Sequence, residues 1–168
     1  MKRLITIGLI ISLFSLLPNH LTFASDEPLK DKFAGLSWGI KPKQVAGLSP
    51  VSPGVPPYQL YRMKPDPMDP IFGKAGLLIL VFNPEMRFVQ GWLSFPKDSV
   101  PLLLLWGYLG PQVMIEPLPG HPVKPTWFPG ENTRVEEYDE GFLFTCRSES
   151  NFLDGASILR ALKDANML

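Results

Sequence analysis

Proline constrains the fold of this chain more than any other residue type. The sequence contains 19 prolines, and most of them lie in three tracts, residues 42–57, 65–70 and 117–129. Each proline fixes its own φ angle, restricts the residue before it and removes a backbone N–H donor. We therefore predict that these tracts form extended loops and that regular structure lies between them.

The first 24 residues have the three parts of a secretory signal peptide. Lys2 and Arg3 precede an uncharged apolar run, residues 4–17, which is followed by Pro18 and by the small-residue pattern Thr22-x-Ala24. A transmembrane helix needs roughly 20 apolar residues, so the run is too short for a typical span. We predict that residues 1–24 direct export and are removed, with retention as an anchor the open alternative. Residues 25–168 would then form a single domain, periplasmic or secreted, without a stable membrane span.

Charge and cysteine content narrow the class of protein further. The chain has 16 basic and 16 acidic residues, and removal of Lys2 and Arg3 leaves 14 basic residues against 16 acidic ones. A nucleic-acid-binding protein would show a basic excess or stripe, so the sequence predicts no such partner. Cys146 is the only cysteine, which excludes an internal disulfide. Its alternation with Phe142 and Phe144 predicts a buried, unreactive thiol.

Between the proline tracts, the hydrophobic pattern predicts two hairpins and two helices. The chain should enter a turn at 33–39, form one helical turn at 42–46 and continue into a strand at 58–63. The hairpins are expected at 76–95 and 133–147, and the helices at 98–109, capped by Asp98 and ended by Gly110, and at the C-terminus, with Leu159, Leu162 and Ala165 on its apolar face. This order predicts an α+β domain: an antiparallel sheet of about five strands built from hairpins, with two helices packed on it.

Residues 33–39 read Phe-Ala-Gly-Leu-Ser-Trp-Gly. This segment resembles the opening of a family of small, exported, uncharacterised bacterial proteins with the motif F-x-G-[IL]-x-W-G. In that family a tyrosine-bearing strand, an apolar hairpin, a helix ending in glycine and a closing hairpin follow. Their counterparts here would be Tyr61, 77–95, 100–110 and 133–149. The resemblance implies the same fold, and it implies no activity because the family has none established.

The predicted helix at 100–109 differs from the amphipathic helix of that family because it has no charged residue. A helix that is apolar all round is normally buried, yet one face of a helix covering a sheet in so small a domain should reach solvent. One interpretation is therefore an exposed patch that binds a protein partner or a second copy of the chain. Its members would come from Leu102, Leu103, Leu105, Trp106 and Tyr108. The other interpretation, which burial statistics favour, is that the proline tracts and the C-terminal helix cover this helix and make it part of the core.

Structural roles explain the other polar and aromatic candidates better than binding roles do. Trp38 should pack in the core, rather than stack on a ligand, with Gly39 at a turn of positive φ. The cluster Glu136, Glu137, Asp139 and Glu140 fits a solvated hairpin tip better than a calcium loop.

The remaining candidates lie in the proline tracts. Asp66 and Asp69 are expected to form turns rather than an acid–base pair, and His121 to be an exposed loop residue rather than a zinc ligand or part of a triad. The P-x-x-P segments 53–56 and 122–125 are expected to be covering loops rather than docking peptides.

The sequence shows no catalytic, metal or cofactor motif, so it predicts neither a cofactor nor an activity. The interpretation that fits best is a non-catalytic exported binding or accessory module of the cell envelope or periplasm. A small-ligand carrier and a hydrolase-type enzyme with an acidic site hidden from sequence stay open as alternatives.

Overall fold

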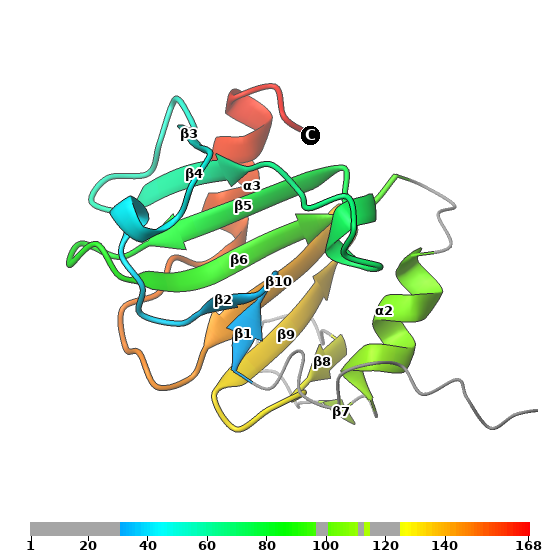
Figure 1. Ribbon diagram of the computed structural model, residues 1–168. Helices are drawn as coiled ribbons and strands as arrows, with labels where there is room; N and C mark the ends of the chain where they lie inside the picture. The colour runs from blue at the N-terminus through cyan, green and yellow to red at the C-terminus, as the bar shows by residue number, and fades with distance from the viewer. Residues whose placement is uncertain (1–30, 97–100, 111–112, 115–124) are drawn as a thin grey trace, which may run out of the picture.

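The computed structural model describes residues 31–96, 101–110, 113–114 and 125–168 (Figure 1). The predicted signal peptide and His121 lie outside these ranges. The described strands are β1 (Lys32–Phe33), β2 (Leu36–Ser37), β3 (Leu48–Pro50), β4 (Gln59–Met63), β5 (Leu77–Phe82), β6 (Phe88–Ser94), β7 (Val113–Met114), β8 (Pro125–Trp127), β9 (Thr133–Tyr138) and β10 (Gly141–Cys146). The helices are α2 (Pro101–Leu109), α3 (Gly155–Asp164) and the short 3₁₀ turns η1 (Pro42–Gln44) and η2 (Phe72–Lys74).

The protein is an α+β domain with an antiparallel sheet and two α-helices in its described part. The sheet runs in the order β3-β4-β5-β6-β10-β9-β8-β7, and β1 pairs with β2 in a separate ribbon. Strands β3 to β6 therefore form one meander and β7 to β10 a second, and the two meanders meet where β6 pairs with β10. Both predicted hairpins are confirmed, as β5–β6 and β9–β10.

The prediction of about five strands is wrong, because the described residues form an eight-stranded sheet. The missed strands, β3, β7 and β8, have only two or three residues each, too few for a hydrophobic period to be recognised. Two of them lie in segments predicted to be proline-rich loops. Pro50 is tolerated in β3 because that strand is at the edge of the sheet, and Pro125 is the first residue of β8.

Every residue of the central strands β5, β6 and β10 is buried, so both faces of the sheet need a cover. Side chains alternate along a strand, and β5 accordingly contributes Leu78, Leu80 and Phe82 to one core and Leu77, Ile79 and Val81 to the other. The first core also contains residues of the β1–β2 ribbon and of α2, and the second contains residues of α3. Figure 1 shows α3 behind the sheet and the ribbon in front of it.

The ribbon covers its face of the sheet by inserting Phe33 above Gly91 of β6. Phe33 is completely buried, and its ring centroid lies 5.0 Å from that of Phe144 and 5.2 Å from that of Phe72. A Cβ atom built on Gly91 would lie 2.6 Å from the Phe33 ring, closer than real Cβ contacts allow. Glycine at position 91 is therefore what makes room for the aromatic ring.

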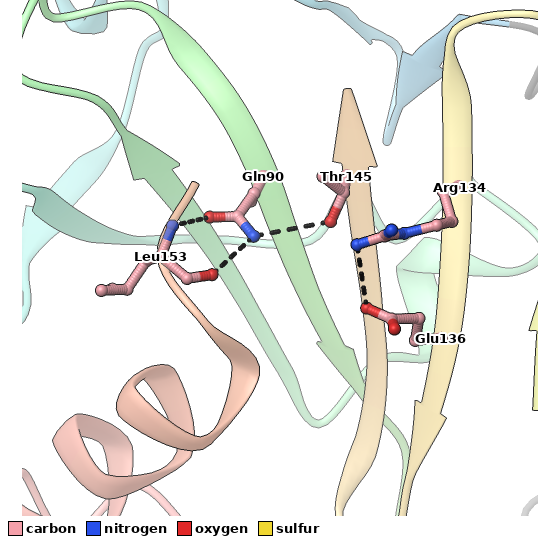
Figure 2. A network of polar contacts seen from close by, with 5 residues as sticks. All are labelled: Gln90, Arg134, Glu136, Thr145 and Leu153. Carbon is pink, nitrogen blue, oxygen red and sulfur yellow. Dashed lines mark hydrogen bonds and ion pairs between the residues drawn. The ribbon is translucent and has the colours of Figure 1, made fainter. Parts of the chain in front are cut away.

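The opposite face is fastened by the buried side chain of Gln90 (Figure 2). Its Oε1 accepts a hydrogen bond from Leu153 N at 2.9 Å, and its Nε2 donates to Leu153 O at 2.9 Å. Nε2 also lies 3.5 Å from Thr145 Oγ1 on β10. The side-chain amide of Gln90 thus satisfies the backbone N–H and C=O of Leu153, the residue just before the N-cap of α3. These bonds hold the start of α3 against the central strands.

Helix α3 begins at a conventional cap. Asp154 accepts hydrogen bonds from the backbone N–H and the hydroxyl of Ser157, and these bonds hold the pKa of the Asp154 carboxyl below its usual value. The predicted apolar face packs on the second core: Leu162 is buried in it, and Leu159 and Ala165 are half-buried against it. The face also includes the buried residues Ile158 and Ala161, which were not predicted.

We expect Gly91→Ala to lower the free energy of unfolding by about 1–3 kcal/mol, because the added methyl group overpacks the site of Phe33. Gly107→Ala is the matched control, since a Cβ atom at this position in α2 would meet nothing within 4 Å. It should leave stability unchanged or raise it slightly, because alanine favours a helix. Urea unfolding of both variants measures the difference, and equal stabilities would contradict the packing described for Phe33.

We expect Gln90→Met to destabilise the fold by about 1–3 kcal/mol, because it keeps the side-chain volume but removes both hydrogen bonds to the buried Leu153. Gln59→Met is the control: Gln59 is exposed on β4, and its side chain accepts a hydrogen bond from the Tyr61 hydroxyl. Its effect should stay within about 0.5 kcal/mol. Similar losses in the two variants would show that Gln90 does not fasten α3.

Candidate functional site

The surface that the sequence singled out lies on α2, which packs on the same face of the sheet as Phe33. Leu105 and Leu109, one helical turn apart, are buried in the core cluster that also contains Trp127 of β8 and Phe142 of β10. The helix ends where predicted, at Gly110, whose φ of 76° is in the left-handed region. The described part of α2 starts at Pro101, and Asp98, the predicted cap, lies outside the described residues.

The outer side of α2 is apolar and exposed. Leu104 and Trp106 are 41% and 40% exposed, and Gly107 next to them is also exposed. In the described part of the chain, the exposed large apolar side chains are Met68, Leu104, Trp106 and Leu168, so α2 carries two of them within three residues. With 100° between successive residues, a helix that turns Leu105 inward must place its neighbours on the two flanks.

Two corrections to the predicted patch follow. Leu105 is completely buried and does not belong to an exposed surface, because it packs with Leu109 into the core against the sheet. Leu104, which was not among the predicted residues, is exposed instead. The exposure of Trp106 agrees with the prediction, while the side chains of Leu102, Leu103 and Tyr108 lie outside what the structure describes. An uncharged helix gives no periodic signal from which its inner face could have been predicted.

Trp38 and Gly39 have the structural roles that were predicted for them. The Trp38 ring stacks on Phe88, with centroids 4.8 Å apart, and its Nε1 donates a hydrogen bond to Thr133 Oγ1 at 3.1 Å. It is half-buried and packs against the first core. Gly39 has a φ of 80°, and its N–H donates to Phe88 O at 2.9 Å. These contacts place the motif against β6 and the start of β9.

The acidic residues of the β9–β10 hairpin do not converge on a common point. Glu136 pairs in register with Leu143 and Glu137 with Phe142, so the two carboxylates lie on opposite faces of the sheet. Glu136 forms an ion pair with Arg134 at 3.4 Å, and Glu140 one with Lys163 at 2.6 Å. Among the described residues, no group of three or more histidine, cysteine, aspartate or glutamate side chains could hold a metal ion.

Local structure explains the other candidate residues that lie in the described part of the chain. Asp66 Oδ1 accepts a hydrogen bond from Met68 N, and Asp69 Oδ1 accepts from Ile71 N and Phe72 N, so both carboxylates form turns as predicted. Cys146 is buried, with Sγ 3.2 Å from Ser148 Oγ. The segment 53–56 leads into a tight turn in which Tyr58 N donates to Val55 O. Of the segment 122–125, only Pro125 is described.

Comparison with known proteins adds no functional information. The chain matches no family model, and neither a curated protein nor a solved structure shows significant similarity to it. The family resemblance of the opening motif therefore stays a prediction. Among the described residues, no helix combines the length and apolar character needed to span a membrane.

We expect Trp38→Ala to destabilise the fold by about 2 kcal/mol or more, because it removes both the stacking on Phe88 and the hydrogen bond to Thr133. Trp38→Phe should lose about 1 kcal/mol, since it can keep the stacking and removes only the hydrogen bond. Thermal unfolding of the two variants tests this order. A Trp38→Ala variant with unchanged melting temperature would point instead to a binding role for Trp38.

The half-buried position of Glu137 predicts a pH dependence. Burial, and then the nearby negative charge of Asp139, raise the pKa of the Glu137 carboxyl above its usual value near 4.5. The folded state therefore holds this proton more tightly than the unfolded state does. The resulting stabilisation is fully present below about pH 4.5 and is lost as pH rises through the folded-state pKa.

It follows that Glu137→Gln should raise the melting temperature at pH 7, and that this gain should shrink below pH 4.5. Glu136→Gln is the control, because it removes an ion pair with Arg134 and should bring no gain at neutral pH. Unfolding curves at pH 4 and pH 7 provide the measurement, and a Glu137→Gln variant less stable than the parent at pH 7 would contradict the argument.

Proposed function

We propose that this protein is an exported, non-catalytic binding or accessory module that contacts another polypeptide, or a second copy of itself, through the outer face of α2. The observation that carries the proposal is the exposure of Leu104 and Trp106, on either side of Gly107, on a helix with no charged residue. Contiguous exposed apolar residues on a small domain are typical of interaction surfaces. The N-terminal sequence supports a place of action in the periplasm or outside the cell.

Comparison with α3 supports this interpretation from within the same molecule. Both helices cover a face of the same sheet, so both need an apolar inner side. The outer side of α3 has the exposed charged residues Arg160, Lys163 and Asp164, as expected for a helix facing water. The corresponding side of α2 has Leu104, Trp106 and Gly107. Covering the sheet therefore does not account for the apolar outer side of α2.

The chemistry of this surface favours a protein partner. A tryptophan that is partly exposed in the free protein can bury a large aromatic area on binding, and tryptophan is enriched among residues that dominate binding energy. Gly107 leaves space between its neighbours, since a Cβ atom there would meet nothing within 4 Å. A side chain of the partner could occupy this space between Leu104 and Trp106.

A photo-crosslinking amino acid at position 107 tests the proposal directly. The open space at Gly107 can accommodate the reagent, and the crosslinker then sits on the proposed surface. Illumination of cells exporting the labelled full chain should give a discrete crosslinked product, which mass spectrometry identifies as a second copy or another polypeptide. The control is the same reagent at position 68, because Met68 is 86% exposed but is not on α2.

Trp106→Glu should abolish the crosslink from position 107 because it places a charge in the proposed interface. Met68→Glu should leave it unchanged. Both substitutions are at exposed positions, so the melting temperatures should stay close to that of the parent. Equal crosslinking from positions 107 and 68, or a product insensitive to Trp106→Glu, would refute the role of α2. A dimer would also crosslink as purified protein, whereas a foreign partner would require the cell.

A further inference from the structure

We draw no further inference here: the strongest candidate, the exposed apolar face of α2 around Leu104, Trp106 and Gly107, belongs to the surface already proposed for binding, and nothing in the structure shows what covers it.

Discussion

The burial of both faces of β5, β6 and β10 is the constraint on which the rest of the structure depends. A sheet of this kind cannot be stable as a single layer, because strands that are apolar on both sides must be covered on both sides. Two unrelated covers meet this need. One is α3 at the end of the chain, held by the amide of Gln90, and the other combines the N-terminal ribbon with α2. The N-terminal ribbon and α2 on one face and the C-terminal helix on the other thus enclose the central strands β5, β6 and β10.

The N-terminal motif is best understood as part of this cover. Phe33 fills the space above Gly91, and Trp38 connects the ribbon to Phe88 and Thr133. Asp31 adds a further connection, because its Oδ1 accepts a hydrogen bond from Asn132 N at 2.8 Å. These contacts give the two aromatic residues of the motif structural reasons to be present. Phe33 is completely buried and the ring and Nε1 of Trp38 already have partners, so the contacts of both residues are explained by the fold.

The sequence predicted those parts of the fold that depend on local pattern. Two continuous apolar segments joined by a turn at Asn83 were enough to predict the β5–β6 hairpin. Gly110 was enough to predict where α2 ends. Features that depend on contacts between distant segments could not be predicted. The fit of Phe33 over Gly91 joins residues 58 positions apart, and the Gln90–Leu153 pair joins residues 63 positions apart. The inner face of α2 was missed for a related reason, since in a uniformly apolar helix only the neighbouring sheet decides which leucine is buried.

The two helices differ in the kinds of contact that hold them against the sheet, and this difference affects how specifically the position of α2 is fixed. Helix α3 has a capping aspartate, a buried amide at its start and charges on its outer side. Among the side chains of α2 that the structure describes, those buried in the core are the apolar Leu105 and Leu109. Apolar contacts are not directional, so they fix the position of a helix less specifically than hydrogen bonds do. A second apolar contact on the outer side, against Leu104 and Trp106, would bury α2 on both sides, as its composition requires of a helix without charge.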